Sequence, residues 1–372
     1  MEGIYYYEKA KNRTTASIGV EKKILQQIKC LKSLGQLKVI NYVFSDNAIE
    51  KIKFLLPFIK SNREMGWGKI LEPANKNTRY IYIRKPSLTT YFYKVLKKVK
   101  RLYPSIFIII EIPTYPFHSE YTGLSRLMIV KSVRCEKNLS KVVDRIATYS
   151  DDKAIWGIPT IRMSNCVNYN EIKPRSEKFK LILNTIRLTC VSNFMYWHGL
   201  DRLINGIKEY EGDYHIILNV VGGGQEIDNL KKLSVDMDNI IFHGAKTGDG
   251  LDKIFDETDI AVDALGRHRS GVYYNSSLKG KEYVARGVPV ISAVKTELDD
   301  IKFPYYLKLP ADESYINIDK IIDFYEKIYK AEKPQAITNK IRILTEELFD
   351  YQNGFTKTIE HELTSMKNER TS

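Results

Sequence analysis

A lysine and a glutamate three residues apart are the most chemically informative pair in this chain. They lie in the segment 276–291, which reads SSLKGKEYVARGVPVI, as Lys279 and Glu282. On a helix this spacing places both side chains on one face. Gly287 suits the left-handed position that follows a helix, and a proline comes soon after it. The segment therefore predicts a helix that begins near the serine pair and leads into a short apolar strand.

The start of such a helix attracts anions through its free N–H groups and its dipole. A cation and a bidentate acceptor beside it suit a nucleotide diphosphate and its ribose. We therefore expect Ser277, Leu278, Lys279 and Glu282 to contact such a ligand, with Lys279 and Glu282 closest to the chemistry. The plainer alternative is a surface helix with an incidental Lys/Glu pair.

The run LKGKEYVARGVPVI resembles the donor-site helix of GT-B glycosyltransferases, in particular the large retaining family 4. The resemblance implies an α/β fold of two doubly wound Rossmann-like domains that face each other across a cleft. It also implies a nucleotide-diphosphate sugar as donor, with no other cofactor and no bound metal. Glu282 matches the second carboxylate of the family's E-x7-E pattern, which holds the ribose. The first carboxylate falls on Tyr274, so the identity of the donor is in doubt.

A second block, residues 191–204, is similar to the family pattern "VGRL…KG.D.LI". The positions of the usual arginine and lysine carry Asn193 and His198 here. An asparagine still donates a hydrogen bond, and a histidine can carry part of a charge beside a phosphate. The resemblance makes both residues donor-site candidates, and the alternative for His198 is a helix-start residue without a ligand.

Two glycine-containing turns extend this resemblance. VVGGGQE, which contains Gly223, is similar to the family turn "VGdGpE" near the donor. FHGAK, which contains Ala245, is similar to the element "FtGrv" that flanks the nucleobase. By themselves the glycines are a weak signal, because the full G-x-G-x-x-G spacing is absent.

Replacements for the missing cations lie in the loop ALGRHRSG, as Arg267 and Arg269. This loop follows a predicted strand that ends at Asp263, and ligands collect at the carboxyl ends of parallel strands. An arginine there can clamp phosphate oxygens. The alternative is a basic loop exposed to solvent.

The first half of the chain holds the candidates for the acceptor side. Gly19 precedes a predicted helix and is similar to the family's GGVE loop, although Ile18 replaces one glycine of the pair. The stretch 108–118, IIIEIPTYPFH, runs from a strand into an aromatic loop and offers Glu111 and His118 as catalytic candidates. The alternatives are an ordinary strand-helix turn at Gly19 and a structural hydrogen bond at Glu111.

These residues must be positioned by strands and helices that alternate along the whole chain. Apolar strands interleaved with helices predict parallel sheets covered on both faces. A polar stretch near Pro174 separates two such series. We expect an acceptor domain at 1–172, a nucleotide-sugar domain at 173–345, and a final helix at 346–372 that packs back on the first domain. The cluster Ser150-Asp151-Asp152 favours the N-cap of a short helix.

Composition limits the class of protein. The 372 residues are 43% hydrophobic and 28% charged, as in globular chains. No apolar run reaches the roughly 18–20 residues of a membrane span, and the start of the chain does not read as a secretory signal. The four cysteines are widely spaced, without a CxxC pair, so we expect reduced thiols and a cytoplasmic protein.

The positive charge is concentrated in the first half. Residues 1–175 carry 32 Lys and Arg against 14 Asp and Glu, whereas residues 176–372 carry 26 against 31. Residues 91–102 read as a basic amphipathic helix, which suits an anionic membrane surface at the inner face or a solvated helix face. The same charge fits a phosphorylated acceptor or nucleic acid, but no nucleic-acid motif is present.

These patterns lead to one main hypothesis and one rival. The first is a glycosyltransferase that moves a hexose or related sugar to a hydroxyl of a lipid-linked saccharide, as in capsule, O-antigen or exopolysaccharide synthesis. The rival is a catalytically degenerate GT-B subunit that supports an active partner, because two usual cations and one usual carboxylate are missing.

Overall fold

The computed structural model describes residues 1–11, 18–56, 59–84, 87–117 and 126–371, and it divides the chain into two compact units. The first unit comprises Met1–Met163 and Gly354–Ser372, and the second comprises Ser164–Asn353. The corresponding boundaries predicted from the sequence are 172/173 and 345/346. Each unit has its own sheet and its own buried apolar cluster.

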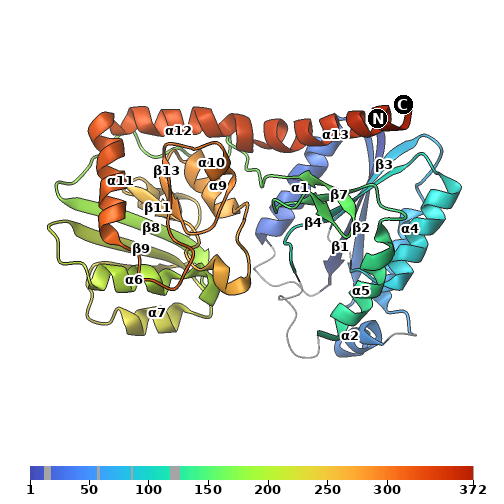
Figure 1. Ribbon diagram of the computed structural model, residues 1–372, viewed down its shortest axis with the longest axis horizontal. Helices are drawn as coiled ribbons and strands as arrows, with labels where there is room; N and C mark the ends of the chain where they lie inside the picture. Colours follow the sequence, from blue (N-terminus) through green and yellow to red (C-terminus); the bar gives the residue numbers. More distant parts are fainter. Residues whose placement is uncertain (12–17, 57–58, 85–86, 118–125, 372) are drawn as a thin grey trace. The chain divides into compact units, whose positions relative to one another are not determined.

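The first unit is a seven-stranded sheet in the order β2-β1-β3-β4-β5-β7-β6. All its pairs are parallel except the one between β6 and β7. Helix α1 covers one face, and α4 and α5 cover the other (Figure 1). The elements are β1 (Glu2–Ala10), α1 (Ile18–Ser33), β2 (Gln36–Phe44), α2 (Ala48–Leu55), α3 (Asn62–Met65), β3 (Thr78–Arg84), α4 (Thr90–Leu102), β4 (Phe107–Ile112), α5 (Leu127–Leu139), β5 (Arg145–Thr148), β6 (Ala154–Ile155), β7 (Ile158–Arg162) and α13 (Lys357–Thr371).

Helix α4 shows why a basic amphipathic pattern does not by itself identify a membrane helix. Thr89 caps its start by accepting a hydrogen bond from the N–H of Phe92. Its apolar face, formed by Phe92, Val95, Leu96 and Val99, is buried in the core of the first unit. That face is therefore not available to a bilayer, and membrane contact through the exposed cations of this helix stays a prediction.

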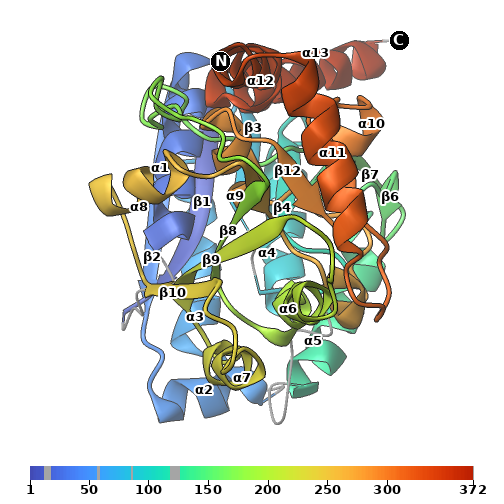
Figure 2. The ribbon, with the colours of Figure 1, turned by 90° about the vertical axis from the view of Figure 1, so that its left-hand side faces the viewer.

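The second unit is a six-stranded, all-parallel sheet in the order β10-β9-β8-β11-β12-β13. Helices α6 and α7 lie together on one face, and α9 and α12 lie on the other (Figures 1 and 2). The elements are β8 (Thr185–Asn193), α6 (Leu200–Lys208), β9 (His215–Gly223), α7 (Ile227–Leu233), β10 (Ile240–Gly244), α8 (Asp249–Phe255), β11 (Ile260–Val262), α9 (Leu278–Ala285), β12 (Val290–Ser292), α10 (Glu297–Asp300), β13 (Tyr306–Lys308), α11 (Ile318–Ala331) and α12 (Pro334–Phe349).

Both sheets have a point at which the strand order reverses. In the first unit the chain passes from β1 to β2 on one side and later returns to β3 on the other. In the second it passes from β8 to β9 and later returns to β11. In open α/β sheets ligands bind outside the carboxyl ends of the strands at such a point. The two-unit α/β architecture with parallel sheets confirms the fold class predicted from the alternating pattern.

No helix among the described residues has both the length and the apolar character needed to cross a membrane.

Candidate functional site

The candidate donor site lies at the carboxyl ends of β8 and β11 in the second unit. Two glycines let the turns after β8 and β9 approach each other closely. A Cβ at Gly222 would lie 1.9 Å from the Ser192 carbonyl oxygen, and one at Gly224 would lie 2.3 Å from that of Phe194. Both glycines have φ near +130°, which L side chains rarely adopt.

Two residues predicted to contact the donor, Asn193 and Gly223, lie beside this close contact and are not covered by other side chains. Asn193 ends β8 with an exposed side chain, and Gly223 lies opposite it in the β8–β9 register. A Cβ at Gly223 would meet no atom within 4 Å, and its carbonyl accepts a hydrogen bond of 2.6 Å from the N–H of Phe194. The structure therefore brings Asn193 and Gly223 together at the carboxyl ends of β8 and β9, and their contact with a donor stays a prediction.

Helix α9 begins against the end of β11. The Ser277 hydroxyl accepts a hydrogen bond of 3.2 Å from the N–H of Gly280 and donates one of 2.9 Å to Asp263 Oδ1. Burial raises the pKa of Asp263, and the Ser277 bond opposes this shift. The carboxylate packs beside the first turn of the helix: a Cβ at Gly280 would lie 3.4 Å from Asp263 Oδ2, an ordinary van der Waals contact. Leu278, half-buried, packs against the core, so its side chain anchors the first turn.

Lys279 and Glu282 project from this helix start on one face, as predicted. Their side chains form an ion pair of 3.3 Å, with 43% and 38% of each exposed. An exposed pair of this kind contributes only about 0–1 kcal/mol to stability. The ion pair can therefore open, and each charged group can bind a ligand instead, at little cost to the stability of the fold.

The opposite side of α9 is held by a buried ion pair that the sequence analysis missed. Lys281 Nζ lies 2.5 Å from Glu297 Oε2 and 3.9 Å from the ring centroid of Phe349. Burial raises the pKa of Glu297, but the charge and hydrogen bond of Lys281 outweigh it, so the pKa lies below its usual value. The helical spacing could have predicted that Lys281 is buried, because it shares the inward face of the helix with Leu278 and Ala285.

Ser276, the residue before the cap, is hydrogen-bonded to Asn165, which is distant in the sequence. Ser276 is buried, its hydroxyl accepts a hydrogen bond of 2.7 Å from the N–H of Asn165, and its carbonyl accepts one from the Asn165 side chain. The start of α9 is thus fixed on three sides, by Asn165, Asp263 and the Lys281–Glu297 pair.

His198 is placed differently from the expectation of a partly charged phosphate ligand. Its Nδ1 accepts a hydrogen bond of 2.9 Å from the N–H of Met195. Burial, helped by the charge of Arg267, lowers the pKa of His198 to about 4, so the ring is neutral at pH 7. The recess beside it has a volume of about 10 Å³, which holds one water at most. The expected partial charge is therefore wrong, although the neutral ring still lies at the edge of the sheet.

The loop after β11 packs closely against residues 198–199. A Cβ at Gly199, which has φ +64°, would lie 2.5 Å from the backbone nitrogen of Gly266. The N–H of Leu265 donates a hydrogen bond of 2.8 Å to the carbonyl of His198. This packing brings the 3-10 turn Arg267–Ser270 next to the carboxyl end of β8.

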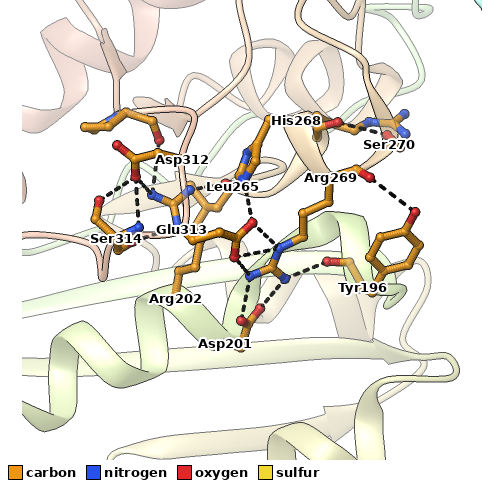
Figure 3. A network of polar contacts seen from close by, with 12 residues as sticks. Tyr196, Asp201, Arg202, Leu265, His268, Arg269, Ser270, Asp312, Glu313 and Ser314 are labelled. Carbon is orange, nitrogen blue, oxygen red and sulfur yellow. Dashed lines mark hydrogen bonds and ion pairs between the residues drawn. The ribbon is translucent and has the colours of Figure 1, made fainter.

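The two arginines of this loop, predicted as alternatives for the same role, have different surroundings. Arg269 makes a two-bond contact with Asp201, at 2.8 and 2.9 Å, and also binds Glu313 and the Tyr196 carbonyl (Figure 3). Its bonds to Asp201 and Glu313 raise its pKa, while Arg269 and then His268 lower the pKa of Glu313 to about 2. Arg269 is therefore a structural clamp between α6 and the loop before α11, which corrects its assignment to the donor phosphates.

Arg267 differs from Arg269 because its charge acts on His198 and Asp263. It is half-buried, its charge lowers the pKa of His198, and it also opposes the raised pKa of Asp263. Its charge therefore acts at the switch point between β8 and β11, so it remains the loop's candidate for a ligand phosphate.

A buried arginine that the sequence patterns did not reveal completes the clamp. Arg202 is 1% exposed and donates hydrogen bonds to the carbonyls of Leu265, Pro310 and Ser314 and to Asp312 (Figure 3). Arg202 thus joins the loop after β11 to the segment 310–314. The partners lie about 60 and 110 residues away in sequence, so no local pattern could reveal them.

Ala245 is not next to the carboxyl ends of β8 and β11, where the other donor-site candidates lie. It is exposed in the loop after β10, the edge strand, which is separated from β8 by β9. Nearby, His243 Nε2 lies 2.8 Å from Asn219 Oδ1. A nucleobase contact at Ala245 stays a prediction.

Glu111, a candidate in the first unit, lies near the carboxyl end of β4. Glu111 is wholly buried, with its Oε1 3.5 Å from both Lys23 Nζ and Arg84 Nε. Its Oε2 accepts hydrogen bonds from Gln27 at 2.9 Å and Tyr82 at 2.8 Å. Burial raises the pKa of Glu111, but the charges of Arg84 and Lys23 outweigh it and keep the pKa below its usual value.

Glu111 is therefore a buried, ionised ion-pair partner and not a carboxylate open to a substrate, which corrects its catalytic assignment. Gly19 is the second residue of α1, so it lies inside the helix start and not before it. His118 and the loop 12–17 that precedes α1 lie outside the described residues. Among the residues that the structure describes, no group of three or more His, Cys, Asp or Glu side chains is placed to hold a metal ion.

Comparisons with known proteins agree with this architecture. No protein-family model matches the chain, and no curated protein matches it. Among solved structures it is similar to the lipopolysaccharide outer core galactosyltransferase WaaB in its apo form, with a TM-score of 0.59 and 13% identity over 98% of this chain and 100% of the other. A glycosyltransferase from Rickettsia africae has a TM-score of 0.62 and 13% identity over 98% of each chain.

The Anabaena protein Alr3699/HepE, solved with UDP and glucose, has a TM-score of 0.56 and 13% identity, and the match covers 98% of this chain and 100% of the other. These structures are GT-B glycosyltransferases. The fold of this chain is accordingly GT-B, with two Rossmann-like domains.

Proposed function

We propose that the protein is a glycosyltransferase that uses a nucleotide-diphosphate sugar as donor. The observation that carries the proposal is the start of α9. There a serine cap, a half-exposed cation and a half-exposed carboxylate meet at the strand-order switch of the second sheet. The GT-B fold supports it, and so do the UDP and glucose bound to the similar HepE structure.

The proposed roles follow from charge and geometry. Lys279 and Arg267 bind the diphosphate, assisted by the N–H groups at the helix start. Glu282 accepts hydrogen bonds from the ribose hydroxyls. Asn193 and Gly223 form the facing wall with their polar side chain and open backbone.

In the proposed reaction, the bond between the sugar's anomeric carbon and the diphosphate oxygen breaks, and its electron pair stays on the diphosphate. The acceptor hydroxyl oxygen forms the new bond to the anomeric carbon, and its proton passes to the departing diphosphate. Preorganised cations stabilise the charge that develops on the leaving group, a role that falls to Lys279. By resemblance to family 4 we propose retention of configuration, and no metal enters the scheme.

For the acceptor we propose a hydroxyl of a saccharide, lipid-linked in cell-surface polysaccharide synthesis such as capsule or exopolysaccharide. The setting would be the cytoplasm, with peripheral contact to the inner membrane face. The basic first half of the chain supports an anionic partner of this kind.

The first test is a thermal-shift screen with UDP, GDP, CDP and dTDP, followed by titration of the best ligand into variants. Lys279→Ala and Glu282→Ala should each weaken binding about tenfold or more, because each removes a charge-assisted hydrogen bond worth about 1.5–3 kcal/mol. Lys330→Ala is the control, since it breaks a similarly exposed ion pair, with Glu326 on α11. Wild-type affinity in both α9 variants would contradict the site.

A transfer assay with a panel of nucleotide sugars separates the enzyme from the degenerate subunit. Sugar transfer or donor hydrolysis supports the enzyme. Nucleotide binding without any turnover would favour the subunit instead.

A further inference from the structure

The first unit contains a groove that the donor site does not use. It lies between the end of α2, the start of α4 and helix α5, and its volume is about 700 Å³. We call it the basic groove and define it by four apolar residues, Leu56, Ile59, Leu127 and Val130, and four cations, Lys60, Lys94, Lys131 and Arg134.

The apolar residues of the basic groove are unusually open to solvent. Leu56, Ile59, Leu127 and Val130 are between 42% and 61% exposed. Helix α2 has no buried residue at all, although it contains four large apolar side chains. Single exposed apolar residues are normal, but several that line one groove indicate a binding surface.

The charged residues of the groove are almost all of one sign. Among the described residues that line it, Glu64 is the only acidic one, and the cap of α3 already uses this carboxylate, which accepts hydrogen bonds from the Ser61 N–H and hydroxyl. Lys131 binds the carbonyls of Phe54 and Leu56 at the end of α2, and so fixes one wall.

The other cations are placed toward the open side. Lys60 Nζ lies 4.3 Å from the ring centroid of Tyr91, and Lys94 and Arg134 are exposed on α4 and α5. In the part of the chain that the structure describes, the groove thus combines an apolar surface with a cluster of cations, and its one lining carboxylate is already used by the cap of α3.

We propose that the basic groove binds a lipid that carries a phosphate headgroup, presented by a bilayer. The apolar residues would contact the chain, and Lys60, Lys94 and Arg134 would bind the phosphate oxygens. Charge complementarity selects an anionic headgroup, and the exposed apolar surface selects a lipid over a free phosphate or an acidic peptide. The inference deepens the proposed function, since such a lipid is the natural carrier of a membrane-bound acceptor, but the binding itself needs no nucleotide.

The test is flotation of the full chain with phosphatidylcholine vesicles, with and without phosphatidic acid. Binding should require phosphatidic acid and weaken with salt. Lys94→Gln/Arg134→Gln should lower the partition coefficient about 25-fold, because each cation near an anionic surface contributes a factor of about five. Leu127→Ser/Val130→Ser should also weaken binding at constant charge.

Helix α1, on the other face of the sheet, supplies matched controls. Lys22→Gln/Lys29→Gln removes two exposed cations, and Val20→Ser/Leu25→Ser removes two exposed apolar side chains. These variants should retain binding. Equal loss in the α1 and groove variants, or no loss in the groove variants, would overturn the proposal.

A soluble probe separates a lipid from a free phosphate. Dihexanoyl phosphatidic acid, titrated as a monomer, should bind more tightly than inorganic phosphate, and Leu127→Ser/Val130→Ser should remove the difference. Equal affinity for the two probes would contradict a lipid site. Because none of these measurements involves a nucleotide, their failure would leave the donor-site proposal standing.

Discussion

The carboxyl edges of the two sheets carry similar side chains in opposite states. At the carboxyl ends of the first sheet, the buried Glu111 is paired with the buried Lys23 and with Arg84, whose side chain is 9% exposed. At the edge of the second, Lys279 and Glu282 form a pair of which about two-fifths is exposed. The first arrangement stabilises the fold, whereas the second leaves charge available to a ligand.

This difference shows that residue type alone does not define a site. A buried carboxylate with two cations is costly to disturb but offers a ligand little. A half-exposed pair is cheap to separate, since water already screens it.

The largest effect is expected from Glu111→Gln. It leaves Lys23 and Arg84 buried without their charge partner, so the free energy of unfolding of the first unit should fall by about 3–5 kcal/mol. Differential scanning calorimetry of the full chain measures this, with Glu72→Gln as the control because it breaks an exposed pair with Lys69. A shift no larger than the control's would show that the buried cluster does not stabilise the unit.

The same variant gives a pH test with a defined sign. The pKa of Glu111 is lowered in the folded chain, so its charge stabilises the fold above the unfolded pKa of about 4.3. That stabilisation is lost as the pH falls through the folded pKa. The gap in melting temperature between wild type and Glu111→Gln should therefore close in acid.

A smaller effect should separate Arg267 from Arg269 on one loop. Arg267→Ala is expected to weaken nucleotide binding about tenfold, as loss of a charge-assisted hydrogen bond does. Arg269→Ala should weaken it less than about threefold and mainly lower the melting temperature, because its partners are Asp201 and Glu313. Calorimetric titration measures both, and the reverse order would show that Arg269 reaches the donor.

Much of the fold could be predicted from local patterns. The alternation of apolar strands with helices along the chain predicted two parallel sheets. The cap at Ser277 and the positive φ of Gly287 agree with the predicted start and end of α9. Local prediction failed at Ser150-Asp151-Asp152, where a short helix was expected. There Ser150 bonds Asp152 at 2.6 Å, and the chain forms the β6–β7 hairpin instead.

The state of each candidate side chain was harder to predict than its place. Arg269 depends on Glu313, 44 residues later, and Glu111 depends on Lys23, 88 residues earlier. Tertiary packing brings such partners together, so the sequence showed the charges but not which of them are already neutralised. His198 illustrates the same limit, because its lowered pKa comes from burial.

The most direct test of the donor site combines a change in the protein with a change in the ligand. The best-binding nucleoside diphosphate and its 2′,3′-dideoxy analogue are titrated into wild type and Glu282→Ala. We predict that wild type loses about tenfold or more in affinity for the dideoxy analogue, whereas Glu282→Ala binds both ligands equally. If Glu282→Ala discriminates between the two ligands as strongly as wild type does, the ribose is not held at the start of α9.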